Sequence, residues 1–186
     1  MSRTMPVAAL VASVILVGCE EAPTGPQGEA GATPLFAHSG LGGAATDQSQ
    51  GVVDATAGFT IAVGGASSQR VAQLFTAGVS GQLVELEVPV ACADGTLLVE
   101  VRNVEAGLPG GEVLAEELFD PSELTWFVPG VATWSVLRLR PSPKLAAGTP
   151  YAMVFGNPTG SCGLLPGPPG DPYAGGDGYA FDLSLI

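Results

Sequence analysis

Positive charge is scarce in this 186-residue sequence. Six Lys and Arg residues stand against 18 Asp and Glu residues, which gives a formal net charge of −12. An acidic chain repels phosphate backbones, and no basic cluster is present to attract anionic lipid headgroups. The composition therefore argues against nucleic-acid binding, and its simplest consequence is solubility.

Histidine is almost absent as well, and this removes several kinds of catalytic site. The single His38 lies in a segment that we expect to be a flexible tether, so neither a Ser-His-Asp triad nor a catalytic zinc site can be assembled in the folded domain. Glu85, Glu87 and Glu100 are candidates for a glycosidase carboxylate pair, but they occupy the polar positions of two alternating strands. We expect them to form a solvated sheet face with a cross-strand Glu–Arg102 pair, and we predict that the protein is not an enzyme.

Long hydrophobic runs are also missing. The longest, Met5 to Val17, has 13 residues and is too short to span a bilayer as a helix, which takes about 20 residues. It follows Arg3 and fits the apolar core of a secretory signal. Its end, Leu16-Val17-Gly18-Cys19, resembles the lipobox of bacterial lipoproteins.

That resemblance implies lipidation of Cys19 and removal of residues 1–18, so that the membrane would be a partner through the acylated N-terminus. Two or three acyl chains hold a protein stably at a bilayer, whereas one chain binds only marginally. Glu20, rather than Asp, follows the cysteine. By the same resemblance this favours export to the outer membrane, with the protein on its periplasmic or cell-surface side.

Residues 19–58 show no sustained period of 2 or 3.6. Small and polar residues dominate this segment, and such a composition buries too little apolar surface to offset the entropy lost on ordering. We predict a disordered tether. Three Gly-X-Y triplets between Gly25 and Thr33 are too few for a collagen triple helix.

From residue 59 onward the sequence alternates short apolar segments with turns. Gly and Pro together number 27 + 16 = 43 residues, aromatics make up only 6%, and no helical period of 10–15 residues separates the segments. Strand patterns occupy 59–63, 71–76, 83–90, 97–104, 134–140, 151–155 and 179–186, while 112–119 fits a strand or a helical turn. We predict an all-β domain over 59–186, an antiparallel, jelly-roll-like β-sandwich of about eight strands.

The alternation also predicts which side chains face the core. In the segment 83–90, Val84, Leu86 and Val88 share one face and Glu85 and Glu87 the other. The same alternation places Leu97, Val99 and Val101 on one face of the segment 97–104, and Leu137 and Leu139 on one face of the segment 134–140. The segment 151–155 is apolar on both faces, as expected for a central strand.

Several short motifs occur in order across residues 69–181. They are Gln73-Leu74-Phe75-Thr76, Gly81-Gln82-Leu83, Leu108-Pro109-Gly110-Gly111, a strand at Trp134, Leu145-Ala146-Ala147-Gly148-Thr149-Pro150-Tyr151 and Tyr173-Ala174-Gly175-Gly176. This order resembles the jelly-roll modules of bacterial surface and secreted proteins known as the choice-of-anchor R type. The resemblance implies a β-sandwich in a surface context, and it carries no agreed activity.

Cys92 and Cys162 form an even pair once Cys19 is lipidated. In a non-reducing compartment we predict a disulfide between them. Their number and spacing exclude a redox CxxC motif or a zinc site.

The Gly/Pro-rich loop 163–179 is the segment most open to a binding role, because a loop of this length is either functional or a cover over the sandwich. Asp171, Asp177 and Asp182 are candidate oxygen ligands for Ca²⁺, although their spacing matches no EF-hand. Trp134, Tyr173 and Tyr179 are candidates for stacking on a sugar ring, with packing as the alternative.

Together these features predict a non-catalytic, lipid-anchored surface or periplasmic lipoprotein without a cofactor, apart from a structural Ca²⁺ as an open alternative. Its β-sandwich would serve as a structural or ligand-binding module, with a glycan or a surface protein as partner. The alternative is a carbohydrate-binding module.

Overall fold

The fold is nearly all antiparallel β-structure, which confirms the predicted fold class. The computed structural model describes residues 13–17, 44–49, 53–54, 60–126, 131, 133–167 and 178–182. Two short 3₁₀ turns, η1 (Gly65–Ser67) and η2 (Pro121–Glu123), interrupt the strands. None of the helices in these ranges has the length and apolarity needed to cross a bilayer.

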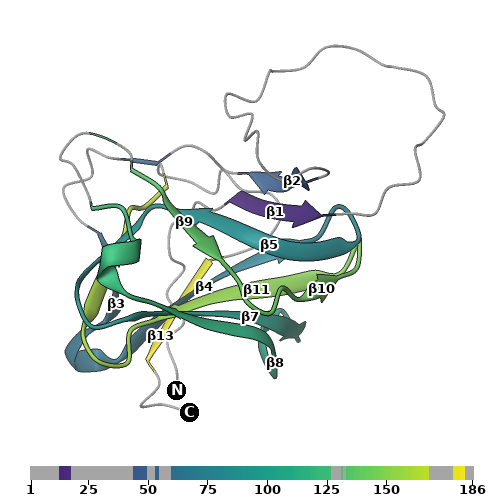
Figure 1. The fold of residues 1–186 in the computed structure, drawn as a ribbon. Helices are drawn as coiled ribbons and strands as arrows, with labels where there is room; N and C mark the ends of the chain where they lie inside the picture. Colours follow the sequence, from purple (N-terminus) through teal and green to yellow (C-terminus); the bar gives the residue numbers. More distant parts are fainter. Residues whose placement is uncertain are drawn as a thin grey trace.

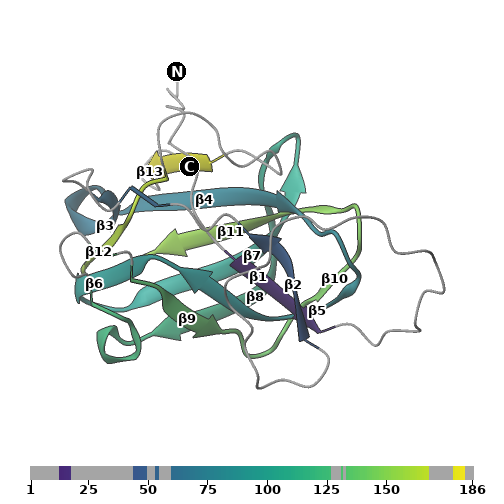
Figure 2. The ribbon, with the colours of Figure 1, turned by 90° about the horizontal axis from the view of Figure 1, so that it is seen from above.

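One sheet has eight strands and forms the lower layer in Figure 1. Its order is β6-β12-β3-β4-β11-β7-β8, with β13 also paired to β4. The strands are β3 (Ile61–Gly64), β4 (Gln69–Thr76), β6 (Val90–Asp94), β7 (Leu97–Glu105), β8 (Leu108–Phe119), β11 (Pro150–Gly156), β12 (Ser161–Leu164) and β13 (Gly178–Asp182). Figure 2 shows β4, β11 and β7 side by side at its centre.

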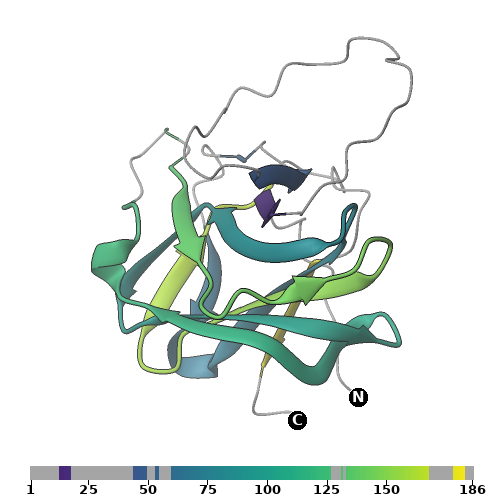
Figure 3. The same cartoon turned by 45° about the vertical axis from the view of Figure 1, so that its right-hand side comes forward.

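The second sheet has five strands and is built around β5. Its order is β10-β5-β1-β2, and β9 pairs with the same edge of β5 as β10. The strands are β1 (Ser13–Val17), β2 (Ala44–Ser49), β5 (Gly81–Val88), β9 (Ser135–Arg138) and β10 (Lys144–Leu145). In Figures 1 and 3 this sheet lies over β7 and β8 as the second layer of a sandwich.

The hydrophobic core lies between the two sheets. The five-stranded sheet contributes Leu83 and Leu86 from β5 and Leu137 from β9, and the eight-stranded sheet contributes the larger share, including Phe75 and Phe155. Burial of this apolar surface from both layers is the main force that holds the sandwich together.

Strand alternation predicted the core correctly in most places. Leu97, Val99 and Val101 of β7 face the core, as expected. The central strand β11 is buried on both faces, since Ala152 and Val154 join a second, smaller apolar cluster on the outer side of the sheet. The ambiguous segment 112–119 belongs to the strand β8.

The prediction for β5 was wrong at one position. Leu83 is in the core, whereas Val84 is only half-buried. The pairing of β5 with β1 shifts register between Ile15 and Leu16, which leaves one extra residue, Val84, on β5. Such an irregularity reverses the alternation, so that residues on both sides of it share the inner face.

Strands also occur in the segments that the sequence assigns to the leader and the tether. β1 lies within residues 1–18 and hydrogen-bonds to β5 on one side and β2 on the other. β2 lies within residues 19–58. The division of the chain into leader, tether and domain remains a prediction.

Candidate functional site

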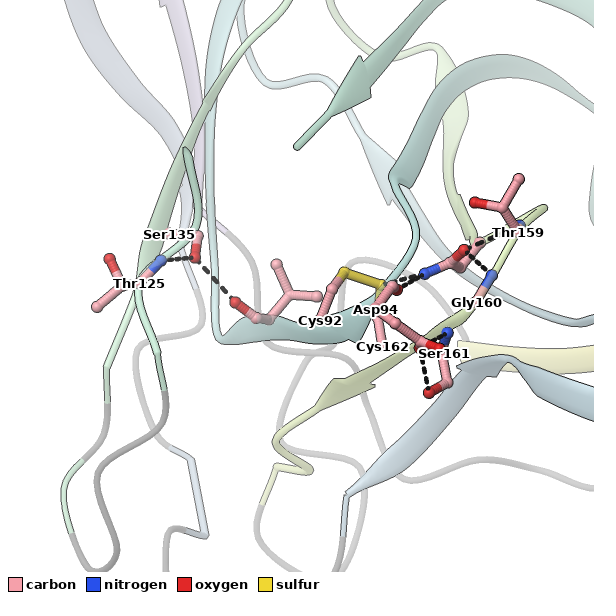
Figure 4. The surroundings of a disulfide bond; sticks show 10 residues. Cys92, Asp94, Thr125, Ser135, Thr159, Gly160, Ser161 and Cys162 are labelled. Carbon is pink, nitrogen blue, oxygen red and sulfur yellow. Dashed lines mark hydrogen bonds between the residues drawn. A yellow bond between two sulfur atoms is a disulfide. The ribbon is translucent and has the colours of Figure 1, made fainter. Parts of the chain in front are cut away.

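The predicted disulfide is present and joins neighbouring strands. Cys92 in β6 and Cys162 in β12 are register partners in an antiparallel pair, and their sulfur atoms are bonded. Both residues are nearly inaccessible, with exposures of 2% and 6%. The bond spans a separation of 70 residues in sequence and joins the edge strand β6 to its neighbour β12 (Figure 4).

The turn beside the disulfide is held by the buried side chain of Asn157 and by the exposed carboxylate of Asp94. Asn157 Nδ2 donates to the carbonyl of Asp94 at 2.8 Å, while Asn157 Oδ1 accepts from the backbone N–H groups of Thr159 and Gly160. Asp94 Oδ1 accepts from both the N–H and the hydroxyl of Ser161 (Figure 4). A Cβ at residue 160 would lie 2.5 Å from the carbonyl oxygen of Asp94, so the close approach of the two chains requires glycine there.

A buried carboxylate with two arginines lies on the outer face of the eight-stranded sheet. Glu100 Oε2 accepts from Arg70 Nη1 at 2.9 Å and from Arg102 Nε at 2.8 Å. The Glu100 side chain is 4% exposed, and the two arginines are 19% and 22% exposed. The three residues form a charge cluster that is largely withdrawn from water.

The expected solvated face was therefore wrong for two of the three glutamates. The expected cross-strand pair was wrong as well, because the glutamate that pairs with Arg102 is Glu100 of the same strand, β7. Glu85 is also buried and pairs with Arg138 Nε at 3.1 Å. Each carboxylate loses water but gains a guanidinium group from a neighbouring position, which compensates its desolvation. Arg70 and Arg138 come from other strands, so alternation within one strand does not reveal them.

The proposed sugar-stacking and calcium residues are only partly described. Trp134 is half-buried just before β9. Tyr179 and Asp182 lie in β13, opposite Ala72 and Gln69 of β4. Cys19, Asp171, Tyr173 and Asp177 lie outside the described residues. Within the described ranges no group of three or more His, Cys, Asp or Glu side chains is arranged to hold a metal ion.

The most exposed aromatic side chain of the described part was not among the predicted site residues. Trp126, between η2 and β9, is 66% exposed. Val131, on the same connection, is 51% exposed, and Val136, the second residue of β9, is 38% exposed. The sequence does mark this region, because no charged residue occurs between Glu123 and Arg138.

The base of this connection is fixed to the sandwich by a hydrogen-bond relay. The N–H of Thr125 donates to Ser135 Oγ at 2.9 Å, and the Ser135 hydroxyl donates to the carbonyl of Val90 at 2.8 Å (Figure 4). Ser135 is fully buried, and Leu124 packs against the core. Trp126 therefore extends from an ordered base one residue beyond this relay.

The turn η2 supports the same base through a capping box. Asp120 Oδ1 accepts from the N–H and the hydroxyl of Ser122, and the N–H of Asp120 donates to Glu123 Oε2. The hydrogen bond from the Ser122 backbone, followed by that from its hydroxyl, lowers the pKa of Asp120 below its ordinary value of 3.8. The same hydrogen bonds form the capping box of η2, so this pKa shift is explained by a structural role of Asp120.

Comparison with known proteins assigns no function to the chain. No protein-family model matches the chain, and no curated protein or solved structure matches it either.

Proposed function

We propose that this chain is an exported lipoprotein, anchored to a membrane through acylated Cys19, whose β-sandwich acts as a structural or ligand-binding module without catalysis. The proposal rests above all on the apolar run that ends in Leu16-Val17-Gly18-Cys19. Cleavage before Cys19 would make this cysteine the first residue of the mature chain. Glu20 favours the outer membrane as its destination, on the periplasmic or cell-surface side.

The disulfide supports export. Disulfides persist in oxidising compartments and are rare in the cytosol, where thiols are kept reduced. Cys92 and Cys162 are buried within the core of the sandwich, so this bond has a structural position.

The arrangement of charged groups supports a role without catalysis. Glu100 and Glu85, the two buried carboxylates of the described ranges, are both committed to arginines. A glycosidase instead needs two carboxyl groups about 5 to 9.5 Å apart that remain available to the glycosidic bond and to water. Asp94 and Asn157 are likewise engaged by backbone groups of their own turn.

A carbohydrate-binding module is the second candidate, since Trp126 presents an open aromatic ring. Sugar recognition also needs hydrogen-bonding groups placed beside the ring. The Thr125 N–H and the Ser135 hydroxyl, the polar groups at the base of Trp126, are already engaged in the relay. We therefore place this function second.

Mass spectrometry of the protein isolated from bacterial membranes tests the anchor. We expect the chain to begin at Cys19 and to carry diacylglyceryl and acyl mass. Cys19→Ser should abolish both processing and acylation. The double variant Cys92→Ser and Cys162→Ser keeps Cys19 and serves as the matched control, which should remain acylated. A membrane-isolated chain that keeps residues 1–18 and has no acyl mass would contradict the proposal.

A further inference from the structure

The strand β1 lies between two other strands of the five-stranded sheet. All five of its residues, Ser13–Val17, have register partners both on β5 and on β2 (Figure 1). β1 belongs to residues 1–18, which the proposed processing before Cys19 would remove. The mature chain would therefore keep β5 and β2 and lose the strand that separates them.

The gap that cleavage leaves has the width of one strand. Neighbouring strands lie about 4.8 Å apart, so β5 and β2 are separated by about 9.6 Å. The other edge of β5 is occupied, because β10 pairs with Gly81 and Gln82 and β9 pairs with Glu85 to Val88. The edge of β5 that faces β1 would then present unpaired N–H and C=O groups, as would the facing edge of β2.

β2 is held at the sandwich by contacts that do not involve the leader. The N–H of Gly78, in the connection between β4 and β5, donates to Asp47 Oδ2 of β2 at 2.9 Å. Further along the chain, the N–H of Asp54 donates to the carbonyl of Pro166 at 2.9 Å. A hydrogen bond to an ionised carboxylate is among the stronger ones. These two contacts attach β2 and the segment after it to the folded domain, so that β2 stays opposite β5 when β1 is gone.

The register shows which side chains an incoming strand needs. Leu83 and Leu86 of β5 are fully buried in the core, and their partners on β1 are Leu16 and Val14. Residues opposite each other on antiparallel strands share one face of the sheet, so a strand in this place needs apolar residues at those two positions. The net charge of −12 disfavours both an acidic strand and a second copy of the chain. The leader strand itself is uncharged and rich in β-branched residues, which suit a strand.

We propose that the mature domain binds an extended, uncharged peptide segment of a partner protein in the slot between β5 and β2, antiparallel to both strands. The backbone of the segment pairs on both sides, whereas strand addition at an ordinary sheet edge uses one side. In the precursor the leader strand β1 fills this slot. The inference rests on the export proposed above, since removal of residues 1–18 opens the slot, and it gives the ligand-binding module a chemical class of ligand.

A synthetic peptide of residues 11–18, with two added lysines for solubility, tests the slot. It is added to the processed chain isolated from bacterial membranes, and the hydrogen exchange of single amides is measured. At saturating peptide we expect the slot-facing amides of β5 and β2 to exchange more than about tenfold more slowly, while the amides of β11 stay unchanged. A peptide with Leu16→Asp places a charge opposite Leu83 and should bind at least about tenfold more weakly.

Two matched variants test the part that β2 plays. Asp47→Ala removes the acceptor that holds β2, and the peptide should bind about fivefold to tenfold more weakly, as expected for one lost hydrogen bond. Asp120 likewise accepts a backbone hydrogen bond but lies beside η2, so Asp120→Ala should leave the affinity unchanged. Equal affinities of the two variants would overturn the two-sided slot.

The precursor supplies the complementary test. The Cys19→Ser chain keeps its leader and should not bind the peptide, because β1 already fills the slot. Ile15→Pro, added to Cys19→Ser, removes a backbone N–H from β1 and disrupts its pairing, so peptide binding should return. Peptide binding to the Cys19→Ser chain with the same affinity as to the processed chain would overturn the slot.

The outcomes separate the slot from the anchor. Acyl mass at Cys19 without protection of β5 by the peptide overturns the slot and leaves the anchor intact. A membrane-isolated chain that keeps residues 1–18 contradicts the anchor, and the variant with Ile15→Pro then decides the slot, since peptide protection supports it and lack of protection overturns it. Protection of β5 in the processed chain without added peptide overturns the proposal, in favour of a second copy if it rises with protein concentration and of β2 itself if it does not.

Discussion

The two sheets of this sandwich differ in where their strands come from. Every strand of the eight-stranded sheet lies between Ile61 and Asp182, within the predicted domain, and the disulfide joins two of them. The five-stranded sheet includes β1, which lies in the predicted leader, and β2, which lies in the predicted tether. The first sheet is thus built entirely from the predicted domain, whereas the second includes segments that the proposed export would remove or release.

The disulfide should have the largest effect on stability. The double variant Cys92→Ala and Cys162→Ala removes a cross-link between residues that are 70 positions apart in the sequence. On the chain-entropy model this should lower the free energy of unfolding by roughly 4 kcal/mol. Urea denaturation followed by circular dichroism measures the loss, and addition of reductant to the unfolded wild-type protein should reproduce it. Equal stability of the variant and the wild type would contradict the prediction.

The buried glutamates allow a matched comparison between the sheets. Glu100→Ala leaves Arg70 and Arg102 mostly buried without their counter-charge, and we expect a loss of about 3 kcal/mol. Glu85→Ala leaves Arg138, whose side chain is 63% exposed and stays hydrated, so the loss should be about 1 kcal/mol.

Urea denaturation of the two glutamate variants tests this ranking. When the dependence of the unfolding free energy on urea concentration is the same in both, the variant with the lower midpoint is the less stable one. Glu100→Gln keeps the volume of the side chain but removes its charge, and it should be nearly as damaging as Glu100→Ala. If Glu85→Ala cost as much as Glu100→Ala, the exposure of the partner arginine would not be the deciding factor.

Removal of the leader should have a smaller and more local effect. β1 pairs with Gln82 to Glu87 of β5. When residues 1–18 are cleaved, the amides of β5 that face β1 lose their partners, and their hydrogen exchange should become faster in the mature chain than in the Cys19→Ser precursor. Amides of β11, which lies between β4 and β7, are the internal control and should exchange equally slowly in both. Unchanged protection of β5 would mean that another strand covers the edge in the mature protein.

The same contrast between the sheets explains what could be predicted from the sequence. Alternation correctly assigned the inner faces of β7 and β9, and the two-sided apolar pattern marked β11 as central. It failed in β5, where one extra residue at Val84 shifts the phase. A register shift depends on the partner strand, so a pattern read along a single strand does not contain it.

The candidate site also contains features that the sequence predicted and features that it did not. The pairing of Cys92 with Cys162 followed from their number and compartment, because few alternatives exist for two cysteines. The burial of Glu100 did not follow, since Arg70 is 30 residues away and reaches it only through the pairing of β4 and β7 with β11. The uncharged run around Trp126 was visible in the sequence, but the aromatic residue proposed there for sugar stacking was Trp134, which the fold half-buries.

The smallest expected effect concerns η2, at the base of the connection that carries Trp126. The pKa of Asp120 is lowered because its carboxylate accepts hydrogen bonds from Ser122. A carboxylate with a lowered pKa in the folded state contributes stability that is fully present above its ordinary value of 3.8 and is lost as the pH falls through its folded value. Exchange of the Ser122 amide should therefore accelerate below pH 3.8 more than the intrinsic rate predicts, while Asp120→Asn should remove this excess. Since Trp126 follows η2 directly along the chain, acidification should also loosen the segment that carries Trp126 before the two sheets separate. An unchanged protection factor at Ser122 across this range would show that the relay through Ser135 holds the connection without the cap.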